Sequence, residues 1–375
     1  MIPSGDATSW RCAQYNGRGG AMAGISLIRV GLCAVATMLA VPGPAQAQDA
    51  CPNRGQLDTQ YCDADRDLVA DAPIDPAKWK DPSTLVWAYT PVEDPAVYAN
   101  IFKPFTEYLK ACVGKPIAYY PVQSNSAEIE AMRSGRLHFA GFSTGPTGFA
   151  VNLAGAVPFA TKGQGGKVQG YTLLAIVKAS SPYQKLADLK GKRVAHTSAS
   201  SNSGNLAPRV LFPAEGLTPE QDYKPLMSGG HDKSTLGVAS GDYDMAAVAS
   251  DVFERMVARG TVKGDDFRIL YKSAVFPTSS FAYAHDLKPE LAAKLKMCFF
   301  DFKFPPEMTK EFNGDDGFVP ITYQKDWAVV REVAEKSGTP YNKSAYDAES
   351  KREAEAAAKK ATAPPPAAPA VTPKQ

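Results

Sequence analysis

The sequence predicts an α/β fold in which strands and helices alternate along most of the chain. From Thr84 to about residue 336, short runs rich in β-branched and aromatic residues alternate with amphipathic helical patterns. Repeated units of this kind usually form parallel sheets with helices on both faces. The composition agrees, because 44% of the 375 residues are hydrophobic and 21% are charged. It excludes a wholly disordered chain, a collagen and a coiled coil, and the length suggests about two domains.

The first part of this region alternates four strands with three helices. Asp94 followed by Pro95 is typical of a helix start, because Asp accepts hydrogen bonds from first-turn N–H groups and Pro fits the first helical position. We expect Pro104 to kink the helix that follows. The expected strands are 84–89, 116–122, 137–142 and 171–177, and the other helices are 126–133 and one opened by Gly145 and Pro146.

The second part continues the same alternation after Ser180-Ser181-Pro182. Apolar runs are again separated by polar turns, and most are followed by a helical pattern. The expected strands are 193–196, 223–226, 243–248, 267–270 and 281–284, and the expected helices are 205–215, one after His231, 251–259, 289–302 and 325–336.

An export signal precedes the folded region. Residues 30–41 are apolar or small, too short a run for the roughly 20 residues of a spanning helix. Arg29 precedes this run, and Ala45-Gln46-Ala47 follows with the small residues of a signal-peptidase site. We expect residues 1–47 to be a signal peptide cleaved after Ala47, with Met22 as an alternative start. A retained membrane anchor is the alternative, and we expect no lipid anchor on Cys33.

The charge balance limits the partners. The formal net charge is +2, and removal of residues 1–47 leaves equal numbers of acidic and basic residues. No basic block is available to neutralise phosphates along a nucleic acid, so we expect no nucleic-acid partner. The single long apolar run excludes a multi-span membrane protein.

Four cysteines remain after the signal peptide, an even number that favours disulfides in an oxidising compartment. Cys51 and Cys62 lie close together in a loop-like stretch, and we pair them. Cys112 and Cys298 each lie on an apolar helical stripe, so a second bond and two buried thiols both remain open. No CxxC or Cys/His spacing indicates zinc or redox chemistry, and we expect no cofactor.

Two flanking segments differ from the folded region. Residues 48–80 form an Asp- and Pro-rich leader, and residues 346–375 form a charged segment followed by a flexible, Pro- and Ala-rich tail. In the leader, Asp63, Asp65, Asp67 and Asp71 could converge on calcium, a hard cation that prefers oxygen ligands. Leu68 and Ile74 stand where an EF-hand needs Gly and Glu. We therefore interpret the stretch as a solvated acidic loop and keep a calcium site as the alternative.

The most informative segment is His196–Asn205, which leaves a strand and enters a helix. Its sequence, HTSASSNSGN, contains five hydroxyl side chains and one Gly. Hydroxyl donors beside the N–H groups of a helix start are suited to a compact anion. Simple capping of the helix is the alternative. A P-loop is excluded, because the sequence has no GxxxxGK[ST].

Two further strand-to-helix turns have a similar composition. One is Ser228–Ser234, which contains His231, and the other is Gly141–Thr147, which contains Ser143 and Thr144. Ligands of open α/β sheets bind beyond the carboxyl ends of the strands, where all three turns fall. We therefore expect one binding site built from these turns.

The sequence resembles the solute-binding components of phosphate, phosphite and phosphonate ABC importers between about Leu85 and Glu335. The resemblance rests on five segments. They are EIEAMRSGRLHFA at 128–140, LADLKGKRV at 186–194, SNSG at 201–204, GHD at 230–232 and GVASGDYD at 237–244. The SNSG and GHD segments are the most particular to the phosphonate group.

The resemblance implies a type II periplasmic-binding-protein-like α/β fold with two lobes joined by a two-strand hinge. The first lobe would comprise 81–178 and 275–345, and the second 179–274. The family's anion-holding residues correspond to Ser201, Asn202 and Ser203, and its ligand-contacting histidine to His231. Of two acidic positions that hold a ligand amine, one corresponds to Asp251 and the other to Ser279. Two aromatic positions correspond to Asn125 and Phe142, which lack the expected Tyr hydroxyls.

These departures favour a smaller oxyanion, or one with a different substituent, over an amine-bearing ligand. We expect a monomeric periplasmic binding protein that captures a tetrahedral oxyanion and delivers it to an ABC permease, without catalysis. One alternative is a ligand-sensing subunit for a membrane kinase. Another is a periplasmic hydrolase that uses a Ser, His231 and Asp251, although the sequence lacks the GxSxG motif.

Overall fold

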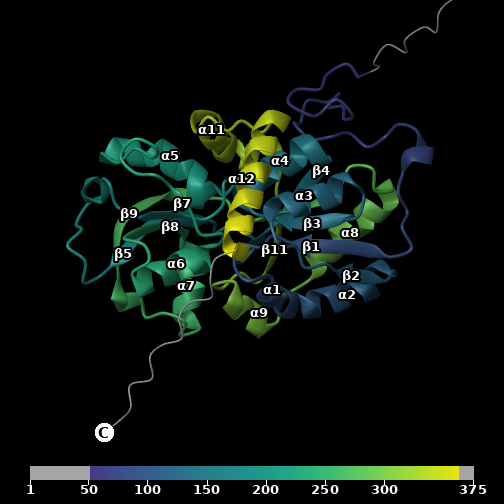
Figure 1. Ribbon diagram of the computed structural model, residues 1–375. Helices are drawn as coiled ribbons and strands as arrows, with labels where there is room; N and C mark the ends of the chain where they lie inside the picture. Colours follow the sequence, from purple (N-terminus) through teal and green to yellow (C-terminus); the bar gives the residue numbers. More distant parts are fainter. Residues whose placement is uncertain (1–50, 363–375) are drawn as a thin grey trace, which may run out of the picture. The chain divides into compact units, whose positions relative to one another are not determined.

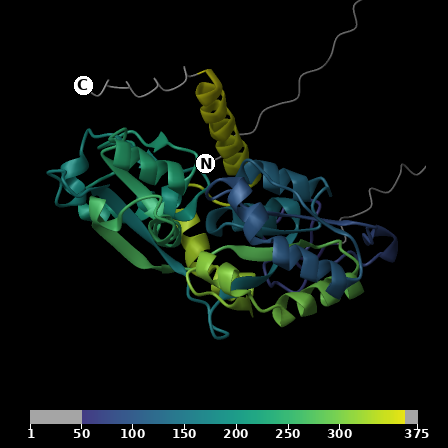
Figure 2. The same cartoon turned by 90° about the horizontal axis from the view of Figure 1, so that it is seen from below.

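The computed structural model of the protein describes residues 51–362. The predicted signal peptide and the Pro- and Ala-rich tail from residue 364 lie outside the described residues. No helix within residues 51–362 is both long and apolar enough to cross a membrane. Figure 1 and, from below, Figure 2 show two sheets, each with its own helices.

The first sheet has six strands in the order β11-β4-β10-β3-β1-β2. Strand β1 pairs in parallel with β2 and β3, whereas β10 runs antiparallel to β3 and β4, and β11 runs antiparallel to β4. The expectation of parallel sheets is therefore wrong for this sheet, because two strands, β10 and β11, run opposite to the other four. The strands are β1 (Leu85–Tyr89), β2 (Ile117–Tyr119), β3 (Phe139–Phe142), β4 (Ala156–Gly163), β10 (Ser280–Ala284) and β11 (Gly317–Pro320).

Helices cover both faces of this sheet. Alternate residues of β1 point to opposite sides, so Leu85 and Trp87 join one buried cluster and Ala88 joins another. The helix expected after Asp94 breaks at Phe102, and Pro104 lies in the first turn of the second piece. The helices are α1 (Pro95–Ile101), α2 (Lys103–Val113), α3 (Asn125–Arg133), α4 (Thr144–Ala154), α8 (Pro289–Asp301) and α9 (Pro306–Glu311).

The second sheet has five strands in the order β7-β6-β8-β5-β9. Strand β5 pairs antiparallel with β8 and β9, and β6 pairs in parallel with β7 and β8. The strands are β5 (Tyr171–Lys178), β6 (Val194–His196), β7 (Leu226–Met227), β8 (Met245–Ala249) and β9 (Phe267–Phe276). The helices are the π-helical turn η3 (Asn202–Leu206), α5 (Ala207–Leu211), α6 (His231–Ser240) and α7 (Ser250–Ala258).

The chain passes between the two sheets after β4 and again after β9. Each sheet with its helices forms one lobe. Strand β5 hydrogen-bonds within the second sheet, so that sheet begins at Tyr171, before the expected lobe boundary at 179. A third link is α11 (Ala328–Lys336), in which Val333 joins the core of the second lobe while Val330 joins that of the first.

The leader is part of the folded structure. Leu57, Tyr61, Val69 and Ala70 are buried in a core cluster of the first lobe. The predicted Cys51–Cys62 disulfide is present, and Cys112 and Cys298, which the sequence left open, also form a bond. The remaining elements are α10 (Tyr323–Asp326), α12 (Lys343–Thr362) and the short 3-10 turns η1 (Pro76–Lys78), η2 (Leu186–Leu189), η4 (Phe212–Glu215) and η5 (Gly264–Asp266).

Candidate functional site

Two adjoining cavities lie at the carboxyl ends of the strands, where the sequence predicted the site. The outer cavity has a volume of about 640 Å³ and the inner one about 30 Å³. Val92, Ser143, Ser201 and His231 line both. The inner cavity has only about twice the volume that a single buried water requires, so it suits a ligand of a few atoms.

The structure brings most of the predicted site residues together. Seven of them line the inner cavity: Ser143, Thr144, Ser201, Asn202, His231, Asp251 and Ser279. Asn125 lines the outer cavity, where its amide donates to Ser198 Oγ at 3.2 Å. Ser203 and Phe142 line neither cavity. Phe142 is fully buried in the first lobe's core, and Ser203 is 1% exposed with no hydrogen-bond partner for its Oγ among the described residues.

Three helices begin at the inner cavity. The wall of the cavity includes Ser143, the N-cap of α4; His231, the first residue of α6; and Ala249, the N-cap of α7. The capping residues of α4, α6 and α7 give their first turns no side-chain hydrogen bond. A helix N-terminus carries partial positive charge and outward-pointing N–H groups, so these three starts make the cavity favourable to an anion.

His231 presents a hydrogen-bond donor to this cavity. Its side chain is buried, and Nδ1 accepts the backbone N–H of Ala249 at 3.0 Å. Burial lowers the pKa of His231 to about 4, so the imidazole is neutral at physiological pH. Because Nδ1 is the acceptor, the single ring proton resides on Nε2. His231 therefore offers an N–H without a positive charge.

Asp251 supplies the negative charge of the inner cavity. Burial alone would raise the pKa of its carboxyl, but Arg255 and Lys162 outweigh burial and hold the pKa below its ordinary value. Arg255 Nη1 lies 3.2 Å from Asp251 Oδ2. An ionised carboxylate only accepts hydrogen bonds, so a ligand group in contact with Asp251 would have to be a donor.

A chain of hydrogen bonds links buried Lys162 to Ser279 in the wall of the inner cavity. Buried Lys162 donates from Nζ to the Tyr89 hydroxyl at 2.8 Å, and Tyr89 donates to Ser279 Oγ at 3.0 Å. The Ser279 hydroxyl then has its own proton left to donate into the cavity. This wall therefore donates hydrogen bonds where an acidic residue would accept them.

A buried ion-pair network links the two lobes. Glu93, in the loop between β1 and α1, accepts from Arg255 Nε and Nη2 on α7 at 3.1 and 3.0 Å. The side chains of Glu93 and Arg255 are 3% and 4% exposed. Arg259 adds a bond from Nη1 to Glu93 at 2.8 Å. The network joins an acid of the first lobe to bases of the second.

Sequence reasoning missed Tyr89, Tyr171 and Thr278, which also line the inner cavity. Tyr89 ends β1 at the same sheet edge as the predicted turns, so the strand-end rule could have identified it. Tyr171 lies at the start of β5, and its hydroxyl accepts from Asn202 Nδ2 at 3.2 Å. No local signal identifies it, because β5 follows a crossing between the sheets.

Comparison with known proteins assigns the family. Residues 87–327 match the family described as ABC transporter, phosphonate, periplasmic substrate-binding protein. The chain belongs to this family. Among curated relatives, the Phosphate-import protein PhnD of Mycolicibacterium smegmatis is 28% identical over 264 residues, covering 66% of this chain and 81% of that protein. The Phosphonates-binding periplasmic protein of Escherichia coli is 24% identical over 249 residues, covering 64% and 73%.

Solved structures show the same fold. PhnD1 of Prochlorococcus marinus, in complex with methylphosphonate, matches with a TM-score of 0.62 and 18% identity, covering 69% of this chain and 99% of that one. A binding-protein component of an ABC phosphonate transporter from Pseudomonas aeruginosa matches with a TM-score of 0.62 and 20% identity, covering 75% and 99%. The predicted resemblance and the two-lobed type II fold are confirmed. This phosphonate-type binding protein thus belongs to a family of periplasmic substrate-binding components of ABC transporters, as predicted.

Proposed function

We propose that this phosphonate-type binding protein captures a small, monoanionic or partly protonated tetrahedral oxyanion in the inner cavity. The ligand class comprises phosphate, phosphite and simple phosphonates. After export to the periplasm, the closed, loaded form presents the ligand to an ABC permease in the inner membrane, without altering it. The proposal rests above all on the inner cavity, which combines several donors with one ionised acceptor.

The donors match an oxyanion. The helix starts at Thr144 and His231, the His231 Nε2–H and the Ser279 hydroxyl surround the cavity. Burying an anion requires several charge-assisted hydrogen bonds, because an unpaired charge away from water is prohibitively unstable. The ionised Asp251 carboxylate then accepts a hydrogen bond from the protonated oxygen of the ligand. It also disfavours anions that have no proton to donate, such as sulfate.

Ser279 favours a ligand without an amine. Family members that bind aminoalkylphosphonates are expected to hold the ammonium with two acids, and Ser279 occupies one of these positions. Lys162, through Tyr89, makes Ser279 a donor. An ammonium group at this wall would meet a hydrogen-bond donor and the nearby positive charge of Lys162. A hydrogen, hydroxyl or methyl substituent avoids that conflict.

The geometry of His231 favours binding over hydrolysis. A Ser nucleophile needs a basic nitrogen that accepts its proton. Nδ1 of His231 is already occupied by the Ala249 N–H, and Nε2 carries the proton. The neutral imidazole therefore has no free lone pair for a serine in the cavity.

Calorimetry with the purified protein tests the proposal. Phosphate, phosphite and methylphosphonate should include at least one tight ligand, whereas 2-aminoethylphosphonate and sulfate should bind more weakly. Ser279→Ala should weaken the tight ligand, and the exposed Ser180→Ala should leave it unchanged as a matched control. Absence of heat with all three favoured anions would contradict the proposal.

A sensing role uses the same binding chemistry with a different partner. Co-purification of the ligand-loaded protein with membrane proteins distinguishes the two roles. A permease as the retained partner supports import, and a membrane kinase contradicts it.

A further inference from the structure

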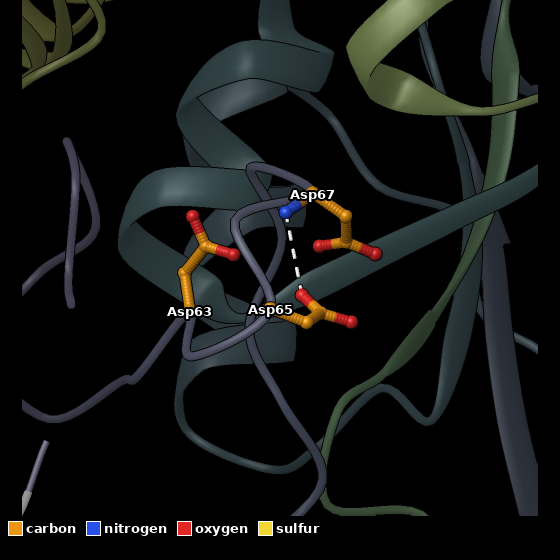
Figure 3. A group of neighbouring side chains, drawn as sticks. All are labelled: Asp63, Asp65 and Asp67. Atoms are coloured by element: carbon orange, nitrogen blue, oxygen red, sulfur yellow. Dashed lines mark hydrogen bonds between the residues drawn. The ribbon is translucent and has the colours of Figure 1, made fainter. Parts of the chain in front are cut away.

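Three carboxylates of the leader converge outside both ligand cavities. One ligand oxygen from each of Asp63, Asp65 and Asp67 lies within 4.8 Å of the others (Figure 3). Calcium binds oxygen ligands at about 2.3–2.6 Å, so two ligands on opposite sides of one ion are about 5 Å apart. The spacing of the three carboxylates therefore fits a single calcium ion. None of the three lines the inner or outer cavity.

Asp63 provides an independent observation that points to a ligand. Its side chain is 1% exposed, and Oδ1 has no hydrogen-bond partner among the described residues. The other oxygen, Oδ2, accepts a long 3.3 Å bond from Asn53. Buried polar atoms nearly always have a partner, and an ionised carboxylate without one is strongly unfavourable. A cation at the cluster would satisfy this oxygen.

The cluster also lacks a countercharge. Within residues 51–362, no Lys, Arg or His forms an ion pair with Asp63, Asp65, Asp67 or Asp71. Lys296 lines the same surface hollow as Asp67 and Asp71, but its Nζ lies over the Tyr283 ring at 5.5 Å.

The loop that carries the cluster is already held in shape. The Cys51–Cys62 disulfide closes it directly before Asp63. Asn53 Nδ2 donates to the Asp63 carbonyl at 2.6 Å, and Ala64 N–H donates to Asp71 Oδ2 at 2.7 Å. Such a framework keeps the carboxylates close together despite their mutual repulsion.

The same loop is attached to the first lobe at two places. The Tyr61 hydroxyl donates to the Leu153 carbonyl at 3.3 Å, and Gln324 Nε2 donates to the Arg66 carbonyl at 3.0 Å. An ion bound at the cluster would therefore stabilise the contact between the leader and the lobe.

We propose that Asp63, Asp65 and Asp67 bind one Ca²⁺ ion, which fixes the leader against the first lobe. The donor set contains only oxygen, without the nitrogen or sulfur that zinc prefers. Asp65 and Asp67 are exposed, so water completes the coordination shell. Calcium tolerates this irregular arrangement, whereas magnesium requires a near-ideal octahedron. This proposal chooses the calcium alternative over the solvated acidic loop.

The test is calcium calorimetry and thermal unfolding of the full chain after treatment with EDTA. We expect binding with a Kd near or below about 1 mM, the weak end of extracellular calcium modules, and a rise in Tm that EDTA reverses. Asp65→Asn with Asp67→Asn should weaken calcium binding at least about tenfold, since it removes two charged ligands. The exposed pair Asp265→Asn with Asp266→Asn is the matched control and should bind calcium like the parent.

Oxyanion binding serves as the folding check for every variant, because the two sites share no residue. If the double variant does not fold, Asp65→Asn alone replaces it. The proposal is overturned if the parent gives neither heat nor a Tm shift with calcium, if magnesium gives the same Tm shift, or if the variant of the cluster binds calcium as tightly as the parent.

Discussion

The backbone N–H of Ala249 donates to Nδ1 of His231 at 3.0 Å, and this bond determines which ring nitrogen carries the proton. Ala249 ends β8 and His231 begins α6, so the tautomer is fixed by the packing of a helix against a strand. As a result, the Nε2–H of His231 is an uncharged hydrogen-bond donor with a fixed direction.

His231→Asn separates the two roles of the imidazole. The Asn Oδ1 can replace Nδ1 as the acceptor for Ala249, but the variant has no donor in place of Nε2. We expect oxyanion affinity to fall by about 1.5–3 kcal/mol, the range for a hydrogen bond to a charged group, with a nearly unchanged free energy of unfolding. Calorimetry and urea unfolding measure the two quantities. Parental affinity in this variant would show that His231 does not donate to the ligand.

Ser279→Asp tests the control of ligand choice. The substitution places a carboxylate acceptor at the end of the hydrogen-bond chain from Lys162 through Tyr89, where the Ser279 hydroxyl is now a donor. We expect the preference to shift toward 2-aminoethylphosphonate and away from methylphosphonate, because the new carboxylate attracts an ammonium and repels an anion. Competition calorimetry with the two ligands measures the ratio. Ser180→Asp introduces the same charge at an exposed site and should leave the ratio unchanged.

The buried pair of Glu93 and Arg255 should stabilise the closed arrangement of the lobes. Glu93→Gln leaves Arg255 buried without its full countercharge, a change that typically costs about 3–5 kcal/mol. We expect a large loss of stability and weaker ligand binding, measured by urea unfolding and calorimetry. Glu332→Gln disrupts an exposed pair with Lys336, and it should change stability by no more than about 1 kcal/mol. Equal effects of the two substitutions would argue against the buried network.

Stability should decrease in mild acid because of His196. Its Nδ1 contacts Asn205 Oδ1 at 2.9 Å and its Nε2 contacts the Tyr223 hydroxyl at 2.7 Å. Burial lowers the pKa of His196 from 6.5 to about 4. Between these pH values the unfolded chain takes up a proton on His196 that the folded protein does not. The free energy of unfolding therefore keeps its full value, as far as His196 is concerned, above pH 6.5 and decreases as the pH falls toward 4.

His231 has the same direction of shift and adds to this effect. Urea unfolding between pH 7 and pH 4 measures the slope of the free energy of unfolding against pH. His196→Gln should flatten that slope even if it lowers stability at neutral pH. An unchanged slope would show that His196 does not cause the acid sensitivity.

The local features of the site were accessible from the sequence. Hydroxyl and Gly residues directly after strands predicted Ser143, Thr144, Ser201 and His231, because a strand end and the following helix start are neighbours along the chain. Phe142 was assigned to the site through the resemblance alone. It lies within β3, and its side chain enters the core.

Other parts of the fold left no local signal. Strands β4 and β11 and helix α9 were not predicted. The first of these contains Pro158 and the buried Lys162, residue types that single-sequence patterns place outside strands. Lys162 is tolerated there only because Tyr89 and the carboxylates nearby balance it, and these partners come from distant segments.

The sequence by itself determined the alternation of strands and helices, the polar turns at strand ends and the Cys51–Cys62 pair, since all of these depend on neighbouring residues. Only the tertiary structure decided the antiparallel strands, the bond between Cys112 and Cys298 and the ion pair of Glu93 with Arg255. The partners in the last two pairs lie 186 and 162 residues apart. Their contacts depend on how whole sheets pack, and that packing has no counterpart in any short stretch of the chain.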